Sequence, residues 1–211
     1  MTEPASRRIS SRKQPKQARS NELVSAILQA AVQVLAQEGA ARFTTARVAE
    51  RAGVSVGSLY QYFPNKAAIL FRLQSEEWQQ TTGLLSDMLG DNALAPFERL
   101  RALVRAFIQS ECDEAAVRGA LADAAPLYRD APEAQAVRGA GEPLFERFIA
   151  EILPDLTAAD RDRVAGMINT TMSAIGREFS EVPRAEAEIS AQADALSDMV
   201  CAYLRSLGAQ A

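Results

Sequence analysis

The sequence predicts an all-α protein on the strength of three observations. Apolar residues recur along most of the chain at the three- and four-residue intervals that place side chains on one face of a helix. Two short helical segments between residues 44 and 62 meet at a glycine, Gly53. No segment shows the sustained alternation of apolar and polar residues that is typical of a half-buried strand. We therefore expect helices from one end of the fold to the other.

The first 18 residues are polar and basic, and Pro4 and Pro15 interrupt them. A segment of this composition buries too little apolar surface to fold by itself, so residues 1–18 are expected to form a disordered arm. Such arms can follow the phosphates of DNA or place an arginine in the minor groove, although a solvated leader is equally compatible with the composition alone. The basic residues concerned are Arg7, Arg8, Arg12, Lys13, Lys16 and Arg19.

A first helix is predicted from Ser20 to the residue before Gly39. Its apolar residues have the spacing of a single buried face. That face, together with Phe43, should cover the next two helices and complete a three-helix unit over residues 19–66. The face consists of Leu23, Ile27, Ala30, Ala31, Val34 and Leu35.

A second, shorter helix is predicted to end at about Ala52. Thr44 or Thr45 can cap its start, because a threonine oxygen accepts from backbone N–H groups that have no partner within the helix. Gly53 ends it, because the left-handed conformation costs least for glycine.

Ser55 can cap a third helix over residues 56–62, and Pro64 cannot continue it. Two helices joined by a short turn with glycine form a helix-turn-helix, whose second helix enters the major groove of DNA. Seven residues at about 1.5 Å each span roughly 10 Å, which suits a groove about 12 Å wide. The alternative is a plain helical hairpin with a solvated face.

The segment from Thr44 to Lys66 resembles the DNA-binding head of TetR-family transcriptional regulators. The residues that match the family motif in its spacing are Thr44, Val48, Ala49, Ala52, Gly53, Val54, Ser55, Gly57, Leu59, Tyr60, Tyr62, Phe63 and Lys66. The resemblance covers about the first third of the chain. The remainder matches the family only in its length and in being predicted as helices throughout. It implies a three-helix DNA-binding head over residues 19–66, followed by a larger helical ligand-binding and dimerisation domain over residues 67–211.

The side chains of this segment suggest how DNA would be bound. Hydroxyl and ammonium groups are suited to phosphates, and small or amide-bearing side chains to base edges. Gln61 can bond an adenine through two hydrogen bonds, and Val56 can contact a thymine methyl group. For Arg47 a phosphate is favoured over an exposed guanine. The expected phosphate contacts are Thr44, Thr45, Arg47, Ser55, Tyr60, Tyr62 and Lys66, and the expected base contacts are Val56, Gly57, Ser58 and Gln61.

Further helices are predicted after the head. Asn65 can cap a helix from Lys66 to about Met88, which should link the head mechanically to the rest of the chain. Pro96 suits the first position of the next helix. A short helix over about 114–124, a less regular stretch to about residue 143, and long helices over about 158–179 and 184–207 complete the chain.

The two closing helices are apolar and rich in small residues, which let helices approach closely. In TetR-like proteins the corresponding helices of two subunits form the dimer interface, so the resemblance implies a homodimer through the last two helices. The alternative is that these helices only close the core of one subunit. The small residues are Ala165, Gly166, Ala174, Gly176, Ala193 and Ala195.

The resemblance also implies a cavity for a small molecule among the middle helices. Its aromatic and methionine lining would suit a largely apolar effector, although core packing explains each residue equally well. The candidate lining residues are Trp78, Phe107, Tyr128, Phe145, Phe148, Met167, Thr171 and Met172. Oxidant sensing by Cys112 is a weaker alternative, because no neighbour in the sequence favours a lowered pKa.

Composition excludes several other functions. The chain has no histidine, which removes serine–histidine and cysteine–histidine nucleophiles and the usual zinc sites. Gly139–Ala140–Gly141 follows no strand and lacks a third glycine, so it is a poor phosphate loop. We expect no enzyme activity, cofactor or metal. The basic start has no apolar core of a secretory signal, and no apolar run approaches a membrane span, so a cytoplasmic location without a membrane is expected.

Charge is divided unevenly along the chain. Residues 1–66 carry a net charge of +6 and residues 67–211 a net charge of −10, which together give the overall −4. A basic head on an acidic body directs the head toward a polyanion. The expected function is a dimeric repressor that a small molecule releases from an inverted-repeat, double-stranded DNA operator. A DNA-binding dimer without a ligand and a protein-interaction adaptor without DNA affinity are the alternatives.

Overall fold

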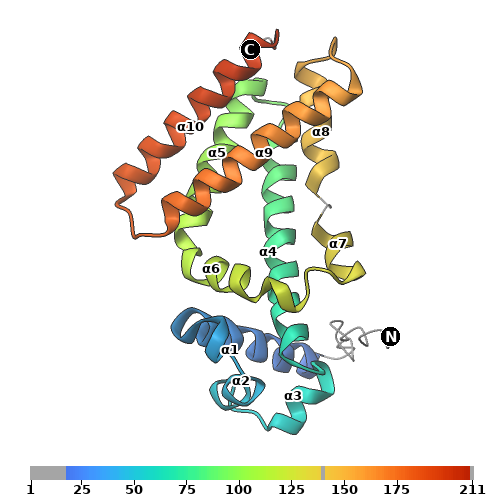
Figure 1. Ribbon diagram of the computed structural model, residues 1–211, viewed down its shortest axis with the longest axis vertical. Coiled ribbons are helices and arrows are strands. Elements are labelled where there is room, and N and C mark those ends of the chain that lie inside the picture. The colour runs from blue at the N-terminus through green and yellow to red at the C-terminus, as the bar shows by residue number, and fades with distance from the viewer. Residues whose placement is uncertain (1–17, 139–140, 210–211) are drawn as a thin grey trace, which may run out of the picture. The chain divides into compact units, whose positions relative to one another are not determined.

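The computed structural model describes residues 18–138 and 141–209, and every regular element within them is a helix (Figure 1). The elements are α1 (Ala18–Arg42), α2 (Thr45–Arg51), α3 (Val56–Tyr62), α4 (Lys66–Leu89), α5 (Pro96–Asp113), α6 (Ala115–Ala124), the 3-10 helix η1 (Ala125–Leu127), α7 (Pro132–Arg138), α8 (Glu142–Ile152), α9 (Ala158–Ser180) and α10 (Glu186–Ser206). The all-α prediction is confirmed. The arm predicted over residues 1–18 lies outside the described residues, except for Ala18, where α1 begins.

The first helix is interrupted where the sequence predicted its end. Gly39 has φ 72° and ψ 172°, which is not a helical conformation, and helical turns resume after it as far as Arg42. A left-handed φ is tolerated there because glycine has no Cβ. The kink ends the regular part of α1 directly after Glu38.

The chain divides into two compact units. The first contains Met1–Trp78 and Ala116–Gly139, and the second contains Gln79–Ala115 and Ala140–Ala211. Helix α4 therefore contributes residues to both units. The first unit extends beyond the predicted head of residues 19–66. The division into DNA-binding and effector domains stays a prediction.

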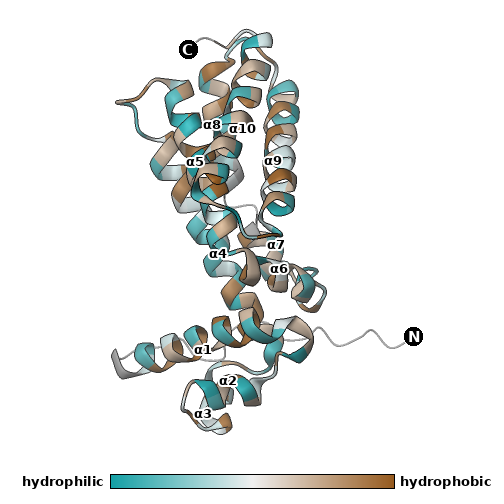
Figure 2. Cartoon of the chain, turned by 90° about the vertical axis from the view of Figure 1, so that its left-hand side faces the viewer, coloured by the Kyte–Doolittle hydropathy of each residue, from teal (hydrophilic) through white to brown (hydrophobic). Residues whose placement is uncertain are grey.

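The core of the first unit joins α1, α2 and α3. Ile27, Leu35, Phe43 and Leu59 have no exposed surface and belong to one apolar cluster. Hydrophilic and hydrophobic residues alternate along α1, as its colouring shows (Figure 2). The buried face predicted for this helix therefore packs as expected against the helix-turn-helix.

Helix α1 is also, by length and composition alone, long and apolar enough to cross a membrane over Ser20–Arg42. Length and composition alone are weak evidence for a membrane span. Ile27, Ala31 and Leu35 of this helix are fully buried in the first unit. A core helix of a globular unit can have the same length and apolar composition as a membrane span.

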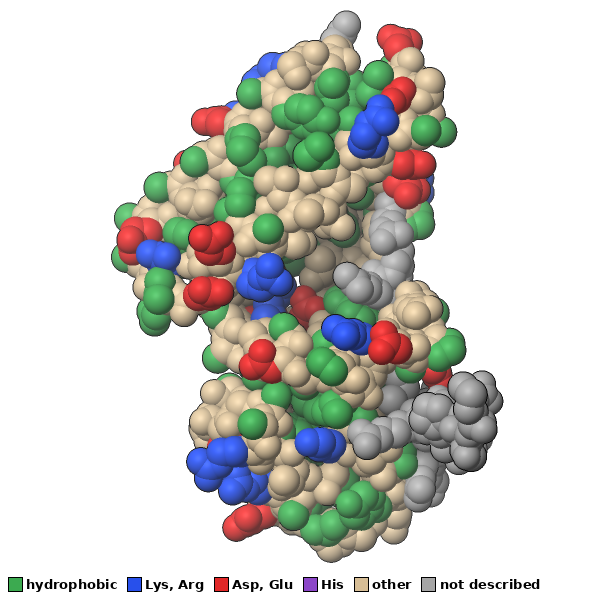
Figure 3. Space-filling model, in the orientation of Figure 1, with side chains coloured by type: hydrophobic (Ala, Val, Ile, Leu, Met, Phe, Trp, Pro, Cys, Tyr) green, Lys and Arg blue, Asp and Glu red, His purple; other side chains and the backbone are tan. Residues whose placement is uncertain are grey.

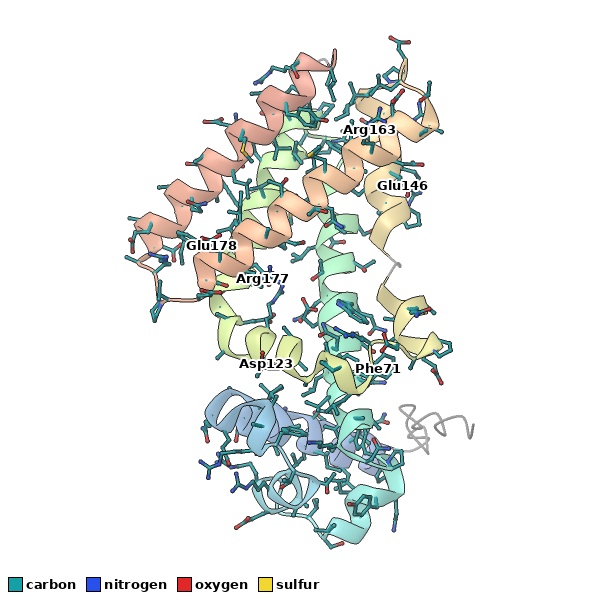
Figure 4. The ribbon with its side chains drawn as sticks, in the orientation of Figure 1. Phe71, Asp123, Glu146, Arg163, Arg177 and Glu178 are labelled. Carbon is teal, nitrogen blue, oxygen red and sulfur yellow. The ribbon has the colours of Figure 1, made fainter. Side chains whose placement is uncertain are left out.

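The same apolar cluster includes the segment from α6 to α7. Phe71 of α4, labelled in Figure 4, lies with its ring centroid 6.1 Å from that of Tyr128. The Tyr128 hydroxyl donates to the backbone oxygen of Leu121 and to Oε1 of Gln74, each at 3.1 Å. The first unit thus holds α6–α7 against the first turns of α4.

In the second unit α5 packs against both α9 and α10. Gly176 of α9 allows a close approach, since a Cβ built there would lie 2.9 Å from Cγ of Glu111 and from Cε1 of Phe107. Helices α5 and α10 share a buried apolar cluster. Two ion pairs also join them, Arg101–Asp198 and Arg105–Asp194.

Candidate nucleic-acid interface

Helix α2 begins where the sequence predicted. Thr44 has an extended backbone, and its Oγ1 accepts a hydrogen bond of 3.3 Å from the backbone N–H of Arg47. This contact supplies a partner for one of the N–H groups at the start of the helix. At the other end Gly53 has φ 67°, and the N–H of Val54 returns to the Ala49 oxygen at 3.0 Å. Local chemistry therefore fixes the turn between α2 and α3.

Helix α3 is capped by Ser55, whose Oγ accepts from the Ser58 N–H at 3.0 Å. The two hydroxyl groups of these serines also lie 2.8 Å apart. Only Leu59 and Tyr62 of this helix are buried. Ser55 therefore serves the helix as its cap while its side chain stays at the surface.

The remaining side chains of α3 form an outward face. Val56 is 39% exposed and Tyr60 is 40% exposed, and Gly57 and Gln61 are exposed as well. Ser58 is half-buried, and its hydroxyl lies beside that of Ser55. All four predicted base contacts, Val56, Gly57, Ser58 and Gln61, thus lie on one short helix.

Thr45 and Tyr60 are brought together across the turn. The hydroxyl of Tyr60 on α3 lies 3.1 Å from Oγ1 of Thr45 at the first position of α2. Two hydroxyl groups from separate helices are therefore side by side at the surface, where one anion can meet both.

Tyr62 does not lie where a phosphate contact would need it. It is only 7% exposed, and its hydroxyl pairs with Oγ of Ser20 at 2.7 Å. The family-like spacing did not separate it from Tyr60, because two positions along a helix turn a side chain to a different face. Tyr62 belongs to the core of the first unit and ties α3 to α1.

The start of α4 follows the prediction in part. Oδ1 of Asn65 accepts from the Ala68 N–H at 3.0 Å, which is the expected cap. Lys66, the first residue of the helix, is half-buried. An ammonium group beside the positive end of a long helix is suited to a phosphate.

Arg47 is held by a residue that the sequence did not single out. Its Nη1 pairs with Oε2 of Glu38, and Nε of Arg42 lies 3.8 Å from the same oxygen. Glu38 and Arg42 are four residues apart, a spacing that indicates a helical ion pair. The contact to Arg47 has no such signal, because it crosses the kink at Gly39.

The eight predicted ligand-lining residues are divided between the units. Trp78 and Tyr128 lie in the first unit, and the other six lie in the second. Met167 is 55% exposed on α9, so within its own unit it lines no interior. Phe145 and Phe148 are buried with ring centroids 6.2 Å apart. The remaining three are Phe107 and Thr171, which are half-buried, and Met172, which is buried.

Metal binding and cysteine chemistry have little support. Among the residues that the structure describes, no three histidine, cysteine or acidic side chains are grouped to hold a metal ion. Burial raises the pKa of the Cys112 thiol, and Asp113 and Glu111 raise it further. Burial likewise raises the pKa of Cys201. A raised pKa lowers the thiolate fraction on which oxidant sensing depends.

Comparison with known proteins agrees with this geometry. A family model described as "Tetracyclin repressor-like, C-terminal domain" matches residues 95–207, and one described as "Bacterial regulatory proteins, tetR family" matches residues 27–73. The fatty acid metabolism regulator protein of Bacillus subtilis (strain 168) is 35% identical over 69 residues, which are 33% of this chain and 36% of that protein. Nucleoid occlusion factor SlmA of Aliivibrio fischeri (strain MJ11) is 55% identical over 42 residues, 19% of this chain and 21% of that protein. The chain thus matches 36% of the length of the first relative and 21% of the length of the second.

Solved structures extend the likeness in fold to most of the chain. The fatty acid degradation regulator FadR from Bacillus halodurans superposes with a TM-score of 0.67 and 19% identity, over 89% of this chain and 96% of that one. NalD, the secondary repressor of the MexAB-OprM multidrug efflux pump in Pseudomonas aeruginosa, gives a TM-score of 0.61 and 19% identity, over 88% and 97%. The helix-turn-helix geometry, the two family models and the shared fold lead to one conclusion: the chain belongs to the TetR family of transcriptional regulators, with a DNA-binding helix-turn-helix at α2 and α3.

Proposed function

We propose that this protein is a cytoplasmic homodimeric repressor that binds an inverted-repeat operator and leaves it when a small molecule binds. The observation that carries the proposal is the outward face of α3. Val56, Gly57 and Gln61 are exposed on a helix of only seven residues that Ser55 caps and Leu59 anchors. A short, rigid helix with small and amide-bearing side chains is what the major groove admits.

The phosphate contacts would flank this helix. Thr45 and Tyr60 present paired hydroxyl groups, and Lys66 begins a long helix whose N-terminus favours an anion. Thr44 and Ser55 lie at the surface beside them. Tyr62 is left out, since its hydroxyl is bonded inside the unit. Arg47 stays a candidate, and its guanidinium is paired with the carboxylate of Glu38.

The dimer would form through α9 and α10. Met167 of α9 and Met199 of α10 are 55% and 47% exposed, which is high for methionine in a helix of a single subunit. Helix α10 contacts α5 through its other face, which holds Leu196, Val200 and Leu204. A two-fold dimer would set two α3 helices about 34–36 Å apart, one turn of DNA.

The effector is proposed to be largely apolar and to bind in the second part of the chain. Two relatives are named as regulators of fatty acid metabolism and degradation, so compounds of fatty acid metabolism are the first class to screen. Such a ligand releases DNA only if it binds the DNA-free shape more tightly than the DNA-bound shape.

The test is fluorescence anisotropy of the purified protein with DNA that flanks its own gene, across a salt series. One inverted-repeat fragment should bind far more tightly than random DNA, and affinity should fall steeply with salt because bound phosphates release counterions. Absence of DNA binding at low salt, by a folded dimer, would instead favour a protein-interaction adaptor. Operator binding that no compound relieves would favour a ligand-independent dimer.

Two variants separate phosphate contacts from base contacts in the same assay. Lys66→Ala should weaken binding to every sequence and reduce the salt slope by about one unit. Gln61→Ala should relax specificity at one base pair, by about 1–3 kcal/mol, and leave the salt slope unchanged. A Lys66→Ala protein with the wild-type slope would contradict the phosphate role.

A further inference from the structure

A polar cleft separates α1 from α2 on the first unit. It has a volume of about 540 Å³ and is lined by Val34, Glu38, Arg42, Arg47, Glu50 and Arg51. Basic side chains gather at the lower left of Figure 3, over the part of the first unit where α1 ends and α2 lies. The cleft carries three arginines and two glutamates, so its charges nearly cancel.

Two arginines of α2, one helical turn apart, reach across this cleft to α1. Arg51 donates from Nη2 to Oε1 of Gln37 at 2.9 Å and from Nη1 to Oε1 of Gln33 at 3.4 Å. Arg47 pairs with the carboxylate of Glu38. Both arginines therefore bind side chains of α1, but neutral amides hold Arg51 and a negative charge holds Arg47.

The difference in charge changes what each arginine offers to DNA. An arginine that donates to a neutral amide contributes its full positive charge to the electrostatic potential around the protein. An arginine paired with a carboxylate contributes almost no net charge, and a phosphate must displace or share that partner to bind it. Glu38 also lies 3.8 Å from Nε of Arg42, so one carboxylate offsets part of two guanidinium charges.

We propose that Glu38 is a positioning residue that holds Arg47 away from the phosphates of non-specific DNA, and so increases the discrimination between operator and random sequence. The inference rests on the proposed function. On an operator, the base contacts of α3 fix the phosphates close to α2 and favour transfer of Arg47 from Glu38 to DNA. On random DNA no such contacts hold the phosphates, and Arg47 stays with Glu38.

The chain itself offers the variant that tests this. Glu38→Gln replaces the carboxylate with the amide that already holds Arg51 in the same cleft, so the hydrogen bond survives while the charge is removed. Glu50→Gln is the matched control. It removes the same charge from the same cleft, and Glu50 makes no ion pair with any residue that the structure describes.

The measurement is the affinity of each full-length variant for a fluorescent duplex of random sequence, across a salt series. Glu38→Gln should bind roughly threefold or more tighter than Glu50→Gln at low salt, and its slope of log affinity against log salt should steepen by about 0.9, the value for one added phosphate contact. A non-specific effect of net charge would make the two variants equal, which would overturn the inference.

Two further variants keep the test decisive. In an Arg47→Gln background the additional effect of Glu38→Gln over Glu50→Gln should disappear; its persistence would show that Glu38 does not act through Arg47. Glu38→Asp retains the charge but shortens the side chain by one methylene, which moves the carboxylate away from Arg47. Its salt slope should therefore also steepen. An unchanged slope would count against the inference even if Glu38→Gln failed to fold.

The wild-type protein separates the two proposals. If it binds no DNA at low salt, the proposed function falls together with the inference. If it binds DNA and the Glu38→Gln and Glu50→Gln variants are equal, only the inference is overturned.

Discussion

Helix α3 of the first unit and the buried polar residues of the second unit place their polar side chains in opposite ways. In α3 of the first unit, five of seven residues are not buried, and their polar groups lie at the surface. In the second unit, Arg99, Glu111 and Ser197 are buried at 3%, 9% and 0% exposure. Polar residues of the first kind are available to a partner, while those of the second kind join helices to one another.

Arg99 illustrates the second kind. Its Nη1 donates to the Leu89 oxygen at 2.7 Å, its Nη2 pairs with Glu151, and its guanidinium lies 5.4 Å from the centre of the Phe148 ring. Three helices therefore meet at one side chain, and only its Nε has no partner among the described residues. A charged residue in this fold is therefore not by itself evidence of a ligand or of DNA.

The largest effect is expected for Arg99→Leu. The substitution leaves the Leu89 oxygen buried without its donor and breaks the link to α8, which should lower the free energy of unfolding by about 2–3 kcal/mol. Denaturant unfolding at fixed protein concentration measures it. Glu151→Gln is the control and should cost less than about 1 kcal/mol, because the Glu151 side chain is 47% exposed. Equal losses would mean that the carboxylate, rather than the buried guanidinium, holds the three helices.

An intermediate effect is expected from two tyrosines two residues apart in α3. Tyr62→Phe removes the part-buried hydrogen bond to Ser20 and should lower the free energy of unfolding by about 1 kcal/mol. Tyr60→Phe removes an exposed hydroxyl beside Thr45 and should leave stability unchanged while weakening DNA binding across all sequences. Unfolding and anisotropy measured on both variants decide the assignment. A loss of DNA affinity in fully folded Tyr62→Phe, equal to that of Tyr60→Phe, would contradict it.

These tyrosines also show how far the sequence reaches. The helix-turn-helix was predictable because its signals are local: Thr44 and Ser55 cap their helices within three residues, and Gly53 makes the turn. The exposed face of α3 followed from the same residues. The contact of Tyr62 with Ser20 was not predictable, because Ser20 lies 42 residues away and belongs to another helix.

The remainder of the fold was predictable as helices but not as contacts. The periodicity of α5, α9 and α10 gives their inner faces, yet nothing in it pairs Glu38 with Arg47 or seats Gly176 against Phe107. Such contacts depend on the kink at Gly39 and on how closely two helices approach, which are properties of packing rather than of composition. The predicted ligand-lining residues, which fall in both units, stay a prediction, since aromatic residues serve cores as readily as pockets.

The smallest effect is expected from the ion pairs between α5 and α10. Arg105 donates from Nε and Nη2 to one oxygen of Asp194 at 3.0 and 2.8 Å, but the two side chains are 61% and 50% exposed. Exposed pairs of this kind contribute little, because water and salt screen them. Arg105→Ala should therefore lower the free energy of unfolding by at most about 0.5 kcal/mol, and the difference should vanish at about 1 M salt. A salt-insensitive loss well above this would place Arg105 with Arg99, as a residue that joins helices, and the contrast between exposed and buried charges would no longer hold within the second unit.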